Sequence, residues 1–465
     1  MNVKKIMTDR NAILFLLVIS ALHGLYNTSM QLYEDEAFYW LWSTRLQLSY
    51  YDHPPMIAYL IKLFTLFGDS EFFVRLAAVA CMSISSWYVF LLSKEVFSND
   101  VAWLTLVTSA LLPATFMGYT IITPDAPLIL FWSTSTYYCY KALFNDRWSN
   151  YILAGLHLGC LMLSKYTSVL FLAFLVLFIL IKMPKSLLNP KAWTAILISF
   201  VLFSPVIIWN YQHDWISFVF QYSHGTTSEF TIHPGKFFEF FGGLFALFTP
   251  IFFSILLYGT FKYRNWFFDN KRFYIVLSYL FPLLFFLYKA LFKKMELNWA
   301  AIAFIPGVIL FAYTVVHYKL WKLYKAGAVI SVLLTMVLLF PSLFFLPPSL
   351  NIQDRISGYK EAIAHIQQYI AEDDVLYSDR YYRAALFTYY TEGHPRSYIP
   401  TPSTYRPFFS LEKTKDFRAM PGIYYSKIDM INELKVLFNH AELLERLTIS
   451  KKGFTEKVFY IYRCN

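Results

Sequence analysis

The sequence predicts a polytopic α-helical membrane protein, with about eleven transmembrane helices and a small C-terminal α/β domain outside the cytoplasm. Two properties of the whole chain indicate the membrane class: its mean hydropathy is +0.44, and 15% of its 465 residues are charged. A soluble core of ordinary shape is too small for so many apolar side chains. A third observation is that the composition becomes soluble from about Asn351. We therefore expect a membrane domain over residues 1–346 and a soluble domain over residues 347–465.

Apolar runs define the membrane domain. Most are roughly 17 to 25 residues long, the length that a bilayer requires, and the run from Tyr151 to Ser164 is shorter. The first run follows three basic residues, and because no small-residue cleavage pattern follows it, we expect it to be retained as a helix. The eleven runs begin near Asn11, Glu71, Val101, Pro127, Tyr151, Thr167, Ala192, Phe237, Phe273, Asn298 and Gly327.

The basic residues predict the topology. Most Lys and Arg residues of the loops fall on one side if the N-terminus is cytoplasmic, as the positive-inside rule requires. An odd number of crossings then places the C-terminal domain on the opposite side. The net charge of +10 is spread over these short loops and forms no continuous basic face, so we exclude nucleic acid as a partner. The four cysteines show neither a disulfide framework nor a zinc-binding spacing.

The first loop on the outer side, residues 33–70, carries unusual chemistry. Tyr33 to Leu48 is polar on one side and aromatic on the other, and Pro55 to Phe67 is apolar but too short to span. Both are typical of helices that lie in the membrane interface. In the C-terminal domain, apolar positions from Ile356 to Ile370 recur at helical spacing, and "DVLYS" and "KVFYIYRC" read as strands.

Three acids on the outer side are candidates for catalysis. Asp35 and Glu36 lie among aromatic residues that can line a pocket and raise the pKa of a carboxylate by desolvation. Asp125, between Pro124 and Pro127, offers a partner carboxylate from a second outer loop. The structural alternative for Asp35 and Glu36 is a solvated helix start, where acids are favoured by the helix dipole.

Six short motifs on this outer face resemble the bacterial membrane glycosyltransferases of the GT-C superfamily, which include protein O-mannosyltransferases and lipid A aminoarabinose transferases. The motifs follow in the order "DEAFYW", "YYDHPPM", "FVRLAA", "TPDAPL", "LSKYT" and "ELNW". The late stretch "DRYYRAALFTYYTEGHP" resembles the outer domain of the same group. The resemblance implies a polyprenyl (undecaprenyl) phosphate sugar as donor, an acceptor outside the cytoplasm, and inversion at the anomeric carbon.

The chemistry of such a transfer assigns roles to the candidate residues. The acceptor needs a general base, for which Asp35 is the candidate, and Glu36 and Asp125 are expected to orient it or to hold the substrates. The leaving lipid phosphate needs fixed positive charges or donors. The candidates for substrate binding are His53, Arg75, Lys165, Lys293 and Lys294, joined by Tyr51 and Asn298 from the matching motifs.

Several of these residues keep a second interpretation. Lys293 and Lys294 are also placed to snorkel at a helix end, and Arg75 to pair with Glu71 one turn earlier. His53 stands where the aminoarabinose transferases carry a Lys before Pro, so a neutral donor, a charged group and no phosphate contact all stay open for it.

A divalent ion held by Asp35, Glu36, Asp52, His53 and Asp125 is an alternative, although the expected enzyme requires no cofactor because cationic side chains suffice for a monophosphate donor.

The expected enzyme is a monomer in the bacterial inner membrane, with a periplasmic C-terminal domain that either recognises the acceptor or caps the cavity. Its partners are the lipid-linked sugar, membrane lipids and an acceptor such as lipid A or another envelope glycolipid. Protein Ser or Thr is the alternative acceptor. A lipid-linked sugar flippase or transporter is the alternative outside the enzyme class, but transporters tend to bind at the midplane.

Overall fold

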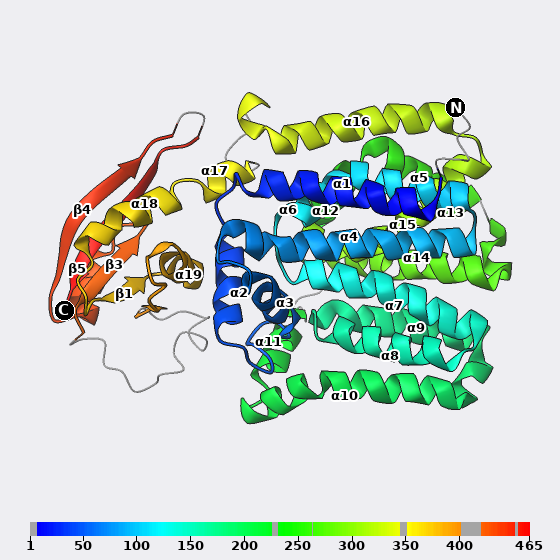
Figure 1. Ribbon diagram of the computed structural model, residues 1–465, viewed down its shortest axis with the longest axis horizontal. Coiled ribbons are helices and arrows are strands. Elements are labelled where there is room, and N and C mark those ends of the chain that lie inside the picture. Colours follow the sequence, from blue (N-terminus) through cyan, green and yellow to red (C-terminus); the bar gives the residue numbers. More distant parts are fainter. Residues whose placement is uncertain (1–6, 226–230, 263, 345–350, 401–419, 452–453) are drawn as a thin grey trace. The chain divides into compact units, whose positions relative to one another are not determined.

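The computed structural model describes residues 7–225, 231–262, 264–344, 351–400, 420–451 and 454–465 (Figure 1). The chain divides into two compact units. The first, here the helical unit, comprises Met1–Thr28, Leu48–Gly68 and Arg75–Met336, and the second, here the C-terminal unit, comprises Ser29–Gln47, Asp69–Val74 and Val337–Asn465.

The helical unit consists of α-helices joined by short loops and 3-10 turns. Its helices are α1 (Asp9–Asn27), α3 (Met56–Thr65), α4 (Glu71–Val96), α5 (Asn99–Leu111), α6 (Pro113–Thr120), α7 (Asp125–Asn145), α8 (Trp148–Met162), α9 (Val169–Lys182), α10 (Pro190–Gln212), α11 (Ile216–Gly225), α12 (Pro234–Leu247), α13 (Pro250–Lys262), α14 (Asn270–Ala290), α15 (Ala301–His317) and α16 (Trp321–Leu339). Two short 3-10 helices, η2 (Tyr166–Ser168) and η5 (Leu297–Ala300), precede α9 and α15.

Five helices are long and apolar enough to cross a membrane: α4, α10, α14, α15 with its preceding turn, and α16. Two bent pairs raise the number to as many as seven if each pair is one span, with a bend of 66° between α5 and α6 and of 102° between α12 and α13. These counts cover the described residues. The other expected runs form α1, α7, α8 and α9, which are shorter or more polar.

Close contact between α8 and α10 fixes the part of the unit that leads to the candidate site. A Cβ atom on Gly155 would lie 2.7 Å from the carbonyl oxygen of Ala195, and one on Gly159 would lie 2.6 Å from Cβ of Leu202. The two glycines are four residues apart and so lie on one face of the helix, as in the small-residue motif that lets membrane helices approach closely. Substitution of either glycine therefore requires the two helices to separate.

The C-terminal unit contains a five-stranded mixed sheet with the strand order β2-β1-β3-β5-β4. Strands β2, β1 and β3 are parallel, and β5 is antiparallel to both β3 and β4. The expected strands "DVLYS" and "KVFYIYRC" are confirmed as β1 and β5. Its strands and helices are β1 (Val375–Ser378), β2 (Ser397–Tyr398), β3 (Gly422–Ser426), β4 (Ala441–Ile449), β5 (Lys457–Cys464), α2 (Glu34–Thr44), α17 (Ile352–Ile356), α18 (Tyr359–Ile366), α19 (Tyr381–Tyr390) and α21 (Ile431–Leu437).

Apolar and aromatic contacts hold the helices of this unit in place. Helix α18 begins after Gly358, whose φ of 87° lies in the left-handed region that glycine tolerates, and it buries Tyr359, Ile363 and Ile366 as its apolar spacing predicts. Helix α2 packs on α19. The ring of Phe38 meets that of Tyr381 edge to face at 4.6 Å between centroids, an arrangement that aromatic pairs favour.

Candidate active site

Three sequence-predicted residues meet in the helical unit. Nζ of Lys165 lies 2.7 Å from Oδ1 of Asp125, and Nδ2 of Asn298 donates a hydrogen bond of 2.7 Å to Oδ2 of the same carboxylate. The Lys165 and Asp125 side chains are 9% and 11% exposed. We name these three residues the Asp125 cluster. The sequence separations are 40 and 173 residues, so the cluster exists only because the helices pack together.

Each member of the Asp125 cluster lies at the end of a helix. Asp125 is the first residue of α7, directly after Pro124, at the helix end where the backbone dipole favours a negative charge. Lys165 has an extended backbone between α8 and η2, and Asn298 lies in η5 before α15. Because helix ends are fixed by the packing of whole helices, the three side chains are held on a rigid base.

The Asp125 cluster leaves N–H donors of the Lys165 ammonium available. Asp125 uses one oxygen for Lys165 and the other for Asn298, with a long contact of 3.5 Å from the Thr123 hydroxyl. A lysine ammonium has three N–H donors, and Asp125 accepts one of them. Within the described residues the Lys165 ammonium makes no other hydrogen bond. The ammonium can therefore hold a further anion while Asp125 fixes its position.

The loop before α3 carries Tyr51, Asp52 and His53. It is tied to α11 by two hydrogen bonds, from the Ser217 hydroxyl to the Tyr50 carbonyl at 2.9 Å and from the Gln221 side chain to the Asp52 carbonyl at 2.8 Å. Burial, together with the ammonium of Lys165, lowers the pKa of His53 to about 3. His53 is therefore a neutral imidazole at physiological pH, and of the interpretations open at sequence level the charged one is disfavoured.

The other predicted phosphate ligands have different surroundings. Arg75 is fully buried and donates to the Asn27 carbonyl at 3.2 Å. Lys293 and Lys294 lie in the loop between α14 and η5, which leads into Asn298. Lys294 is 68% exposed and lies 3.9 Å from the Glu296 carboxylate, whereas burial and the nearby Lys289 lower the pKa of Lys293.

The acids of α2 belong to the C-terminal unit, and their environments differ. Glu36 is fully buried, and its carboxylate accepts the backbone N–H of Tyr33 at 2.7 Å, which caps the helix start. Asp35 is partly buried, and within the described residues its hydrogen bond is a long one of 3.5 Å from the Tyr381 hydroxyl. Burial, followed by the charge of Glu34, raises the pKa of Asp35 to about 6. This value suits a base at neutral pH.

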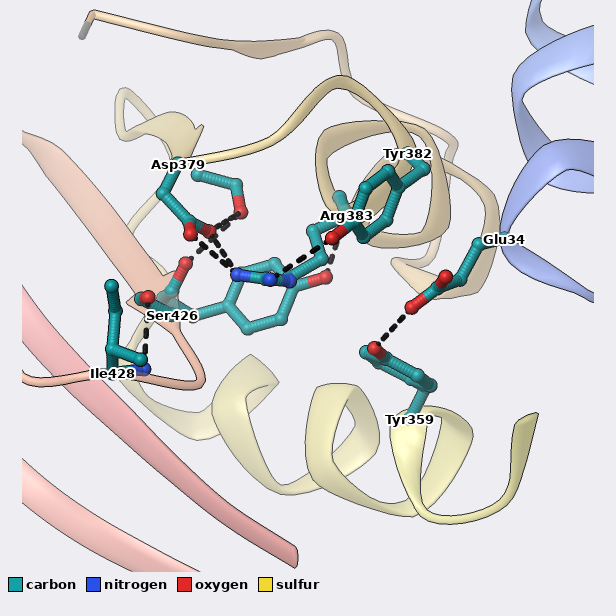
Figure 2. Close-up of polar contacts among 9 residues, drawn as sticks. Glu34, Tyr359, Asp379, Tyr382, Arg383, Ser426 and Ile428 are labelled. Carbon is teal, nitrogen blue, oxygen red and sulfur yellow. Dashed lines mark hydrogen bonds and ion pairs between the residues drawn. The ribbon is translucent and has the colours of Figure 1, made fainter. Parts of the chain in front are cut away.

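Sequence reasoning missed a polar network around Glu34 (Figure 2). Tyr359 donates a hydrogen bond of 2.6 Å to Oε1 of Glu34, and Arg383 forms a buried ion pair with Asp379 at 2.5 to 2.6 Å. The signal available in the sequence was the spacing of Asp379 and Arg383, an acid and a base four residues apart. The partner of Glu34 is 325 residues away and had no local signal.

A metal ion needs several ligand side chains close together. Among the residues that the structure describes, no three His, Cys, Asp or Glu side chains are grouped so that they could hold one. Asp125 and His53 instead share their surroundings with the ammonium of Lys165.

Comparison with known proteins defines the class. Residues 52–209 match the family described as dolichyl-phosphate-mannose-protein mannosyltransferase. The fold is similar to that of ArnT from Cupriavidus metallidurans bound to undecaprenyl phosphate, with a TM-score of 0.69 and 12% identity over 97% of both chains. It is also similar to the arabinofuranosyltransferase AftD from Mycobacteria, with a TM-score of 0.52 and 12% identity over 97% of this chain and 40% of that one.

The sequence matches support a multi-pass membrane glycosyltransferase, and the chain has the fold of the GT-C enzymes that its motifs resemble. The similarity extends to a particular relative in sequence. The lipid A galacturonosyltransferase RgtD of Rhizobium johnstonii is 25% identical over 387 residues, which cover 79% of this chain and 80% of RgtD.

Proposed function

We propose that this glycosyltransferase moves a single sugar from a polyprenyl phosphate to lipid A or another envelope glycolipid, with inversion at the anomeric carbon. The name of RgtD supports a lipid A acceptor, and the undecaprenyl phosphate bound to ArnT supports the donor class. The observation that carries the proposal is the Asp125 cluster, because a buried ammonium with free donors is suited to the phosphate of a lipid leaving group.

The reaction is a single displacement. An acceptor oxygen attacks the anomeric carbon of the donor sugar, the bond from that carbon to the phosphate oxygen breaks, and the phosphate leaves with the bonding electron pair. Lys165 stabilises the charge that develops on the phosphate, and Asp125 with Asn298 keeps the cation and its surroundings in place. Neutral His53 acts as a hydrogen-bond donor or acceptor beside this cation.

Asp35 is the proposed general base, and it takes the proton of the acceptor oxygen. Its pKa of about 6 leaves it ionised at neutral pH and yet a stronger base than an ordinary aspartate. Catalysis by proton transfer typically contributes a factor of about 10² to 10⁴ in rate. The raised pKa and the open carboxylate favour Asp35 over the capped Glu36 for this role.

The proposal keeps the topology that the sequence predicts. It has about eleven crossings, a cytoplasmic N-terminus and a periplasmic domain over residues 347–465, and the enzyme works as a monomer without a cofactor. The bent pairs and the shorter helices α1, α7, α8 and α9 are the candidates for the crossings beyond the five long ones.

The test is transfer by the purified chain from undecaprenyl-phosphate-linked sugars, with a galacturonosyl donor first, to lipid A. The variant Asp35→Asn keeps the size of the side chain and removes the base, so the rate should fall by about 10² to 10⁴. Asp373→Asn, at an exposed acid, is the matched control and should be unaffected. Full transfer by Asp35→Asn would refute the assignment of the base.

A Ser- or Thr-containing peptide in the same assay tests the alternative acceptor, which the mannosyltransferase family match favours. Product on the peptide and none on lipid A would replace the proposed acceptor. Movement of the lipid-linked sugar across a vesicle membrane, without any acceptor product, would identify a flippase.

A further inference from the structure

Four cations gather around Tyr359 in the C-terminal unit. Arg355 lies in α17, Arg383 in α19, Lys427 directly after β3, and Lys457 at the start of β5. The pKa of Lys427 responds to the charges of the other three cations and of Glu34. This cluster of residues has no role in the proposed transfer step.

Three of the four cations have partners in the chain. Arg383 pairs with Asp379 at 2.5 Å, and Arg355 lies 3.6 Å from Oε2 of Glu34. Lys457 donates to backbone carbonyls at the end of α17, among them that of Ser357 at 2.7 Å. These three therefore serve the structure of the unit.

Lys427 is different. Its Nζ lies 4.4 Å from the centroid of the Tyr359 ring, a cation–π contact, and within the described residues it has neither an ion pair nor a hydrogen bond to its side chain. Both carboxylate oxygens of nearby Glu34 are engaged, one by Tyr359 and one by Arg355. Burial, followed by the charge of Lys457, lowers the pKa of Lys427 to about 8. An oxyanion beside the Lys427 ammonium would offset both the cost of burial and the repulsion from Lys457.

The backbone that carries Lys427 is held in place. The buried hydroxyl oxygen of Ser426 accepts the backbone N–H of Ile428 at 3.2 Å and so spans Lys427 (Figure 2). One residue further on, Asp429 accepts from the Tyr462 hydroxyl at 2.8 Å. The backbone of this turn is therefore already ordered before Lys427 binds a ligand.

We propose that Lys427, lying on the ring of Tyr359, binds a phosphate group, and that this phosphate belongs to the glycolipid acceptor. The second part rests on the proposed function. The C-terminal unit thereby recognises the acceptor. The site also selects for charge, since a glycolipid that lacks the phosphate gains nothing from Lys427.

The experiment measures thermal unfolding of the purified full chain in detergent with inorganic phosphate, glucosamine 1-phosphate or glucosamine, at equal ionic strength. Both phosphates should raise the unfolding temperature and glucosamine should not. Lys427→Met should weaken the apparent affinity for phosphate about tenfold or more, as expected for a charge-assisted hydrogen bond. Lys427→Arg should retain binding, and Lys435→Met, at an exposed lysine of α21, should match the parent.

A phosphate response that persists in Lys427→Met and disappears in Lys165→Met would assign the anion to the Asp125 cluster and overturn the proposal. In the transfer assay, Lys427→Met should raise the KM for phosphorylated lipid A about tenfold with little change in kcat, and with dephosphorylated lipid A it should match the parent. An unchanged KM would refute the acceptor assignment. If the parent chain transfers no sugar at all, the proposed function fails while the phosphate-binding result stands by itself.

Discussion

The buried pair of Asp125 and Lys165 gives the sharpest test of the site geometry. Removal of one partner leaves an uncompensated charge in a place where the side chains are 9% and 11% exposed. Breaking a buried pair in this way typically costs about 3 to 5 kcal/mol. Asp125→Ala also releases Asn298, so we expect a loss in this range in the free energy of unfolding. The assay is unfolding in mixed micelles by titration with sodium dodecyl sulfate.

A double-mutant cycle separates the pair from its surroundings. Because apolar replacement of both partners is often close to neutral, Asp125→Ala combined with Lys165→Met should cost no more than one single variant, at least about 3 kcal/mol less than the sum of the two. The exposed pair Lys94 and Asp9, at 2.6 Å with 40% and 50% exposure, is the control and should show a coupling of about 0.2 to 1 kcal/mol. Equal coupling energies for the two pairs would refute the reasoning that burial sets the strength of the Asp125 cluster.

Three further predictions concern the catalytic groups. The kcat/KM of the parent enzyme should rise with pH to a plateau above about 6, the pKa of Asp35. The variant His53→Gln should keep this pH profile because His53 is already neutral in that range. A profile that flattens in His53→Gln would contradict this assignment. Above pH 6, Asp35→Asn should unfold at a higher temperature than the parent, and this gain should disappear toward pH 4. The reason is that folding raises the Asp35 pKa, so the ionised carboxylate destabilises the folded state. An equal gain in unfolding temperature at pH 4 would show another cause. Lys165→Met should lower kcat by about 10² to 10³, as loss of one group that stabilises developing charge does. The control Lys294→Met, at an exposed lysine, should change kcat by less than about tenfold. Equal losses of kcat in the two variants would contradict a special role for Lys165.

Local pattern predicted the elements of the fold well. The strands β1 and β5 and the helix α18 follow from spacing alone, because one face of each must be buried. The number of membrane crossings was harder to predict. Helix α7 carries Ser, Thr and Tyr residues among its apolar ones and α8 has 15 residues, so length and composition do not decide whether they span.

The candidate site was predicted in its residues but not in its contacts. Charge or motif predicts Asp125, Lys165 and Asn298 one by one, but no local pattern predicts the 2.7 Å contacts that join them across three helix ends. Glu34 and Lys427 were missed for the opposite reason. The contacts of both residues come from partners in other elements, Tyr359 above all.

The two candidate carboxylates, Asp35 and Asp125, have environments that assign them different roles. Both oxygens of Asp125 are occupied, and a proton on it would deprive the buried ammonium of Lys165 of its counter-charge. Burial and the charge of Glu34 already favour a proton on Asp35, and the single long hydrogen bond from Tyr381 opposes it only weakly. We therefore propose Asp35, whose pKa is raised, as the group that accepts a proton released by the acceptor. Different environments for two carboxylates are the usual means by which an enzyme assigns them different roles, and we propose that Asp125 holds the cation that stabilises the leaving phosphate.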